Sequence, residues 1–77
     1  MKISVRICGH LQHDAPGKRA EHTLTLKPGA TLLDAIEELG IPRAEVAMRL
    51  VNDQHVKNDH PLSDGDELAL VPVIAGG

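Results

Sequence analysis

The sequence predicts one α+β domain, in which a single helix packs on one face of a small mixed sheet of four to five strands. Apolar and polar residues alternate in several segments, which is typical of half-buried strands, and one segment has an apolar stripe at helical spacing. The length of 77 residues suits one domain. A chain of this size buries only about 60–65% of the surface of its unfolded form, so its core depends on regular patterning.

The N-terminal part predicts two strands joined by a loop. Ile3, Val5 and Ile7 share one face of the first strand, and polar residues occupy the other. Residues 9–20 show no periodicity and contain Gly and Pro, so we expect a loop there. A second strand follows with Leu24 and Leu26 facing inward, before the turn residues Pro28-Gly29.

The middle of the chain predicts the helix. Thr31 is a suitable N-cap, and Asp34 stands three residues later, close to the pattern of a capping box. Gly40 is a natural left-handed terminator. The apolar stripe that follows the cap consists of Leu32, Leu33, Ile36 and Leu39.

The C-terminal part predicts two longer strands around a short one. Val46, Met48 and Leu50 alternate as one strand and are expected to pack on the sheet face that carries the core, and Asn52-Asp53 reads as a turn. A short strand over residues 54–57 and a compact turn over residues 61–66 follow. The last strand begins at Leu68 and runs to Val73, so we expect a domain over residues 1–73 and a flexible tail over residues 74–77.

The tail ends in two glycines, Gly76 and Gly77. Glycine is costly to order and buries no side chain, but it is thin enough to enter a narrow channel. Four extended residues, 74–77, reach about 13–14 Å. Such a tail is suited to carrying its terminal carboxylate into the active site of another protein. The other reading of a diglycine end is a frayed terminus without function.

Four segments of the chain stand out in combination: Thr31–Gly40, Val51-Asn52-Asp53, Asp64–Leu68 and Val73–Gly77. This combination resembles the ThiS/MoaD family of ubiquitin-like sulfur carriers. The resemblance covers essentially the whole chain, and its most specific part is the spacing between the Asp-Gly-Asp turn and the Gly-Gly end.

The resemblance implies a β-grasp fold and a carrier that is not itself an enzyme. Gly77 would be adenylated by a ubiquitin-activating-like adenylyltransferase, which uses ATP, and then converted to a thiocarboxylate by a sulfur donor. Gly76 would give the tail its slender approach. Asp64, Gly65 and Asp66 would be structural turn residues.

A set of residues around the tail is expected to contact partners. Ile74 and Ala75 belong to the tail itself, and Leu70 and Pro72 lead into it. Arg49, together with Val51, is expected by analogy with ubiquitin-like folds to lie on the exposed sheet face, on the alternate phase of its strand.

The two branches of the family differ in the acceptor of the sulfur. ThiS-like members serve thiazole formation in thiamine biosynthesis with thiazole synthase, and the Val-Ile-Ala-Gly-Gly ending favours this branch. MoaD-like members are the small subunit of molybdopterin synthase and insert their tail into the large subunit; the length of the chain and the loop over residues 9–20 favour that branch. A non-covalent ubiquitin-like binding module and a protein-conjugation function are further alternatives.

Other functional classes are disfavoured by composition. A net charge of −3 and the absence of aromatic residues argue against nucleic-acid binding. No apolar segment approaches the length of a membrane span, and no leader is visible, so a cytoplasmic location is expected. No phosphate-binding glycine loop and no catalytic constellation can be placed, and no stably bound cofactor is expected.

Cysteine and histidine are the remaining candidates for chemistry. Five histidines are present, but Cys8, His10 and His13 form only one loose cluster, so we expect surface histidines and no metal site. Cys8 is expected to be a small, partly exposed strand residue on the face opposite Ile3.

Overall fold

The computed structural model describes residues 1–74 and forms a five-stranded sheet with the strand order β2-β1-β5-β3-β4. The order along the chain confirms the predicted sequence of strand, strand, helix, strand, short strand and strand. The elements are β1 (Lys2–Ile7), η1 (Gly9–Asp14), η2 (Pro16–Lys18), β2 (Glu21–Thr25), α1 (Leu32–Leu39), η3 (Arg43–Glu45), β3 (Val46–Val51), β4 (Gln54–His55) and β5 (Glu67–Pro72).

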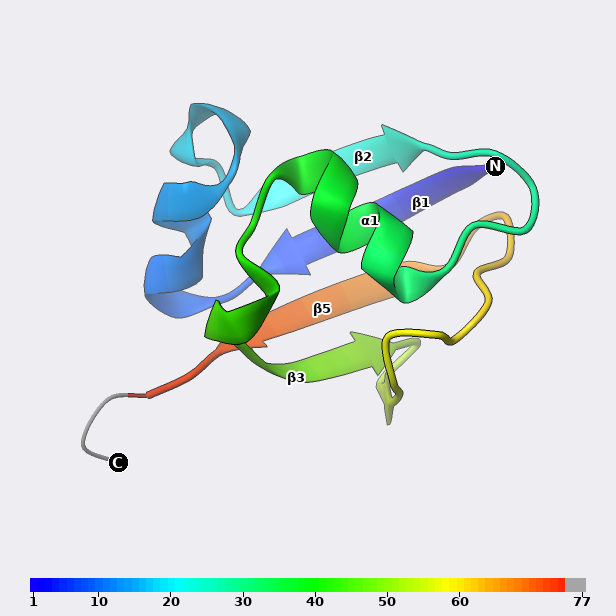
Figure 1. Ribbon diagram of the computed structural model, residues 1–77. Helices are drawn as coiled ribbons and strands as arrows, with labels where there is room; N and C mark the ends of the chain where they lie inside the picture. Colours follow the sequence, from blue (N-terminus) through cyan, green and yellow to red (C-terminus); the bar gives the residue numbers. More distant parts are fainter. Residues whose placement is uncertain (75–77) are drawn as a thin grey trace.

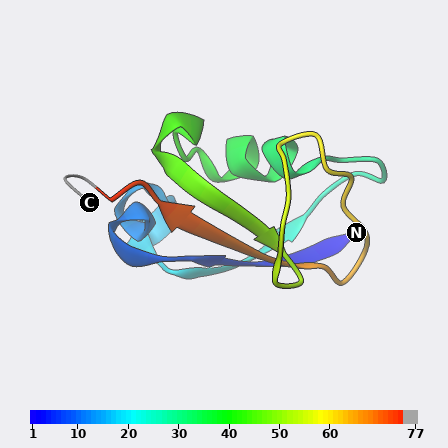
Figure 2. The same cartoon turned by 90° about the horizontal axis from the view of Figure 1, so that it is seen from below.

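The sheet is mixed, and its last strand in sequence lies in its middle (Figure 1). β5 runs parallel to β1 on one side and antiparallel to β3 on the other. β1 also pairs antiparallel with β2, with Ile3 opposite Leu24. Seen from below, α1 lies on one side of the sheet, so the described part of the chain has two layers and leaves the other sheet face open (Figure 2). This is the predicted α+β fold.

Both predicted ends of the helix are confirmed. Thr31 caps α1 through a capping box: the Asp34 carboxylate accepts from the Thr31 backbone N–H at 2.8 Å, and Asp34 N–H donates to Thr31 Oγ1 at 3.4 Å. Gly40 has φ +74°, the left-handed conformation that glycine adopts without strain. Ile41 N–H donates to the carbonyl of Ile36 at 3.3 Å, which turns the chain back over the last helical turn.

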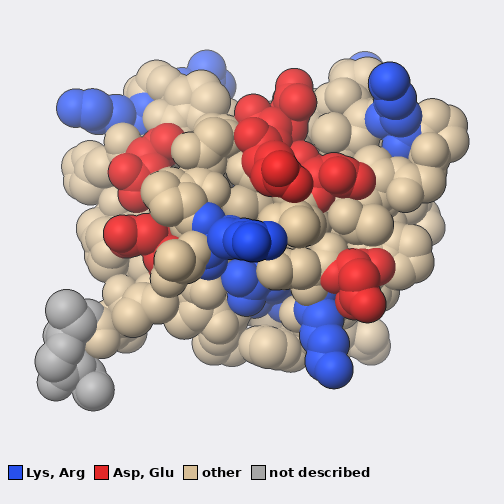
Figure 3. Space-filling model, in the orientation of Figure 1, with Lys and Arg blue, Asp and Glu red and all other residues tan. Residues whose placement is uncertain are grey.

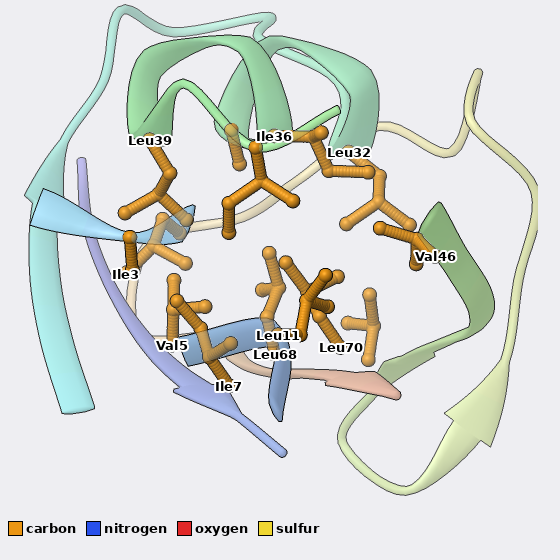
Figure 4. Packing of buried hydrophobic residues seen from close by; sticks show 14 of the residues in the cluster. Ile3, Val5, Ile7, Leu11, Leu32, Ile36, Leu39, Val46, Leu68 and Leu70 are labelled. Carbon is orange, nitrogen blue, oxygen red and sulfur yellow. The ribbon is translucent and has the colours of Figure 1, made fainter. Parts of the chain in front are cut away.

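The core lies between α1 and the covered face of the sheet (Figure 4). Leu32, Ile36 and Leu39 point from the helix toward side chains of β1 and β5. One further core residue, Leu11, comes from η1 and is fully buried. The largest side chains with almost no exposure are Ile3, Ile7, Leu11, Leu32, Ile36 and Leu70.

Leu11 explains why the segment over residues 9–20 is not an irregular loop, as predicted, but two 3₁₀ helices. The segment buries Leu11 and also the small side chain of Ala15, and two apolar side chains in a polar segment are too few to show in the sequence that the segment folds back onto the core. Two boundaries also differ from the prediction. β4 contains only Gln54 and His55, and β1 ends at Ile7, so the half-buried Cys8 precedes η1 instead of lying in the strand.

The Asp-Gly-Asp turn is a structural clamp, as the family resemblance implied. The Asp66 carboxylate accepts from Ser63 N–H at 2.8 Å and from Asn52 Nδ2 at 3.1 Å. Asn52 in turn accepts from Glu67 N–H at 3.0 Å through its side chain. Asp64 accepts from Lys2 N–H at 2.7 Å. These bonds fasten the start of β5 to both of its neighbours, which fixes the register of the central strand.

No helix among residues 1–74 is long and apolar enough to cross a membrane.

Replacing Asp66 tests this clamp. We expect Asp66→Ala to lower the free energy of unfolding by about 1–3 kcal/mol, because Ser63 N–H and the Asn52 amide lose their acceptor. Asp59→Ala is the matched control, since Asp59 is an exposed aspartate of the same half of the chain, and surface changes of this kind stay within about 0.5 kcal/mol. Urea denaturation measures both variants. Equal stabilities would contradict the clamp.

Candidate functional site

The end of β5 is where the chain leaves the domain. Val73 follows the last strand residue, and its N–H donates to the carbonyl of Glu45 in η3 at 2.9 Å. The Val73 side chain is 48% exposed, and that of Ile74 is 72% exposed. In Figure 1 the described trace runs outward past η3, away from the sheet. The predicted site residues Ala75, Gly76 and Gly77 lie outside the described residues.

A close contact holds the exit point in place. Gly9 has φ +56°, and a Cβ on it would stand 3.2 Å from Cγ of Pro72. Only glycine combines this left-handed conformation with so close an approach at no steric cost. Next to this contact, the N–H of Cys8, the residue before Gly9, donates to the carbonyl of Leu70 at 2.9 Å. The segment that follows β1 therefore packs directly against the last residues of β5, just before the tail.

Two of the residues that were predicted to contact a partner are buried beneath the point where the chain leaves the domain. Leu70 has no exposed surface, and Pro72 is also buried. Their side chains belong to the covered face of β5, because alternate residues of a strand point to opposite faces. The prediction that these two side chains flank a partner surface is therefore corrected, since both are buried; Ala69 and Val71, the residues of the other phase, are the partly exposed ones.

The open sheet face carries an apolar strip beside the exit. Met48 is opposite Val71, and Leu50 is opposite Ala69, across the β3–β5 ladder. Met48 is 40% exposed, and the other three are partly buried. Val73 continues the phase of Ala69 and Val71 along the chain. We call Met48, Leu50, Ala69 and Val71 the exit strip.

A β-bulge determines which residues of β3 form this strip. The register shifts between Val46 and Met48, so that β3 has one residue more than β5 over this stretch. Val46 and Val51 are therefore both buried, although residues an odd number of positions apart point to opposite faces of a regular strand. Met48 and Leu50 turn to the open face, and the predicted inward phase of these two residues is wrong.

The same bulge corrects the prediction for Arg49 and Val51. Val51 is a core residue with 5% exposure. Arg49 lies opposite Leu70, on the covered side of the sheet, and its Nη2 donates to the carbonyl of Arg43 at 3.4 Å. Its Nε is buried without a partner among the described residues. No feature of the sequence marks the bulge, since Val46-Ala47-Met48 contains neither Gly nor Pro.

The cysteine and the histidines do not form a second centre in the described structure. No three His, Cys, Asp or Glu side chains of residues 1–74 lie close enough together to hold a metal ion. Cys8 is half-buried and bonds to Leu70 through its backbone, which is a structural role.

Comparison with known protein families shows to which family the chain belongs. The sequence profile described as ThiS family matches residues 5–77, almost the whole chain and all of the tail. The chain belongs to the ThiS family. No curated protein sequence matches this ThiS-family chain.

Solved structures share its fold at low sequence identity. SAMP1 from Haloferax volcanii matches over all of both chains with a TM-score of 0.81 and 21% identity. Another match, in a complex of subunits 1 and 2 of the molybdopterin-converting factor from Helicobacter pylori, also covers both chains fully, with a TM-score of 0.67 and 24% identity. Urm1 from Trypanosoma brucei matches with a TM-score of 0.73 and 17% identity, covering 99% of this chain and 95% of that one. These similarities establish the ubiquitin-like β-grasp fold that is common to small carrier and subunit proteins.

Replacing Gly9 tests the contact that holds the exit. Gly9→Ala introduces a left-handed alanine and a methyl group against Pro72. The control Gly29→Ala introduces the left-handed alanine alone, because Gly29 has φ +89° and open space around it. We expect the control to lose about 1–2 kcal/mol of stability and Gly9→Ala to lose more. Amide hydrogen exchange of Val73 should become faster only in Gly9→Ala. Identical behaviour of the two variants would show that the Pro72 contact is unimportant.

Proposed function

We propose that the chain is a sulfur carrier whose terminal glycine, Gly77, is loaded by partner enzymes. The observation that carries this proposal is the position of the exit: within residues 1–74 the last backbone hydrogen bond to the domain is that of Val73, and the family match continues through the diglycine. A tail that starts at an exposed Ile74 and ends in residues without side-chain bulk suits insertion into a narrow active site.

The chemistry follows from the weakness of a carboxylate as an electrophile. An adenylyltransferase partner transfers AMP from ATP to the Gly77 carboxylate and releases pyrophosphate. A sulfur nucleophile, hydrosulfide in the simplest case, then attacks the acyl carbon and displaces AMP, which leaves a thiocarboxylate. The carrier contributes no catalytic group in this scheme; it presents the acid and is recognised.

The exit strip is the proposed recognition surface for the adenylyltransferase. It is the part of the open sheet face that adjoins the tail, since Val71 stands two residues before Val73. A partner that covers this strip is correctly placed to receive residues 74–77. Ile74 and Ala75 would line the entry of the partner's channel, with Gly76 giving the approach to Gly77.

We assign the acceptor pathway to thiazole formation in thiamine biosynthesis, with thiazole synthase as the acceptor, in the cytoplasm. The alternative acceptor is the large subunit of molybdopterin synthase. Affinity capture by the thiocarboxylate form, tested with purified thiazole synthase and with the large subunit of molybdopterin synthase, separates the two. Retention of the second protein alone would overturn the thiazole assignment while leaving the carrier proposal intact.

The loading reaction gives a direct mass test. When the chain is co-produced with the adenylyltransferase of the same organism, we expect its intact mass to rise by about 16 Da, the difference between sulfur and oxygen. Deleting Gly77 should abolish the increase and leave the urea midpoint unchanged, because a terminal glycine has no side chain to contribute to the core. Persistence of the free acid in the full-length chain would contradict the proposal and favour a non-covalent binding module.

A charge in the exit strip tests the recognition surface. Met48→Lys should slow loading by about tenfold or more, because a lysine in an apolar contact must be desolvated. Asp59→Lys is the control, an exposed position outside the strip that should load at the normal rate. Intact-mass time courses with limiting adenylyltransferase measure both. Slower loading by Asp59→Lys alone would place the recognition surface elsewhere.

A further inference from the structure

The two edges of the sheet are protected very differently. The edge formed by β4 contains only two residues. The other edge, β2, is five residues long and is interrupted by neither proline nor a bulge. In Figure 1 β2 lies at the outer side of the sheet, with β1 as its neighbour. A regular, uninterrupted edge strand of this kind offers its backbone groups to another strand.

The hydrogen-bond pattern shows which backbone groups β2 offers. Ile7 N–H donates to Ala20 at 2.7 Å, and Leu26 N–H donates to Met1 at 2.9 Å. Antiparallel ladders alternate, so His22 and Leu24 also bond to β1, and the residues between them point their backbone groups away from it. Glu21, Thr23 and Thr25 therefore present their N–H and C=O groups at the free edge. None of these groups bonds to another part of residues 1–74.

An acidic wall stands beside this edge on the covered side of the sheet. Asp34, Glu37 and Glu38 of α1 line a hollow together with Thr25 at the end of β2 and with Leu26 and Lys27, which follow it. Three carboxylates therefore face this hollow against the single ammonium of the exposed Lys27. The space-filling view shows acidic side chains gathered over α1 (Figure 3). α1 has no Lys or Arg, and Glu37 and Glu38 stand in its last turn, at the negative end of the helix dipole. The carboxylates of Asp34, Glu37 and Glu38 repel one another, and a cation bound in this hollow would reduce that repulsion.

The charges distinguish between possible occupants of the edge. A second copy could pair with β2 about a two-fold axis at Thr23, but this would place two acidic α1 faces on the same side of the joined sheet. A strand with Lys or Arg on its helix-facing side meets no such repulsion and gains attraction. We propose that the β2 edge is a strand-addition site for an extended basic segment of a protein partner, whose cationic side chains face Asp34, Glu37 and Glu38.

This site is separate from the tail. β1 and β5 lie between β2 and β3, and the tail leaves past η3 on the β3 side. A segment bound at β2 therefore leaves the exit strip, Val73 and Ile74 uncovered. The inference does not depend on sulfur transfer, and it predicts that binding survives deletion of Gly77.

The test uses the full chain and a short capped peptide in which Lys and Val alternate, with a Glu-Val peptide as the control. We expect the Lys-Val peptide to shift the backbone amide resonances of Glu21, Thr23 and Thr25 in an NMR titration. Their hydrogen exchange should slow, because the amides become bonded. The Glu-Val peptide should bind at least about fivefold more weakly.

Matched variants separate the backbone from the charge contribution. Thr23→Pro removes the central outward N–H but no bond to β1, and edge strands tolerate such a proline. Thr23→Pro should lower the affinity of the chain for the Lys-Val peptide by about tenfold, whereas Thr23→Ala should leave this affinity unchanged. The double variant Glu37→Gln/Glu38→Gln should lower the affinity for the Lys-Val peptide by about fivefold. The control Glu67→Gln/Asp59→Asn, which loses the same charge elsewhere, should bind the peptide as the unchanged chain does.

Several results would overturn the inference. The absence of amide shifts with the Lys-Val peptide at millimolar concentration is one. Equal binding of the two peptides, or shifts confined to the exit strip, would contradict the proposed charge or position. Concentration-dependent protection of Thr23 in the chain alone would identify a second copy as the occupant.

Discussion

The pairing of β5 between β1 and β3 is the constraint on which the rest of the structure depends. Because β5 is central, it pairs with β1 over Glu67–Leu70 and with β3 over Leu68–Pro72, and its covered side chains Leu68 and Leu70 are buried. Such a strand cannot slip without exposing the core. The Asn52–Asp66 clamp fixes its beginning, and the contact of Pro72 with Gly9 fixes its end. The point where the tail leaves the domain is therefore set by the most constrained strand.

This arrangement explains how a small core serves a carrier. A chain of this length has little apolar surface to bury, and the core uses aliphatic side chains from the sheet, α1 and η1. After β5, Val73 is still bonded to Glu45, and the side chain of Ile74 is exposed and adds nothing to the core. The open sheet face is left to the exit strip and the polar side chains of β1 and β2. In the proposed function, a partner recognises this rigid face and receives the tail that starts beside it.

The sequence was sufficient to predict the five strands and the main helix, but it missed the three 3₁₀ helices and the details of register. Thr31, Asp34 and Gly40 predicted the helix ends correctly, because capping is a local effect of a few residues. Alternation predicted β1 and β2 correctly for the same reason. The bulge in β3 depends on pairing with β5, which is distant in sequence, so the sequence assigned Met48 and Arg49 to the wrong faces. Leu70 and Pro72 were placed near the tail correctly, but their burial depends on the phase of β5 in the finished sheet.

The central claim is that the domain ends at Val73 and that the chain beyond it is available to a partner. Amide hydrogen exchange, followed residue by residue in the isolated chain, tests this most directly. The Val73 N–H, bonded to Glu45, should exchange about 10-fold or more slowly than an unstructured amide, whereas the Ile74 N–H should exchange at close to the unstructured rate. Equal, strong protection of Ile74 and Val73 would contradict the account, because it would mean that the chain after β5 is bound to the domain.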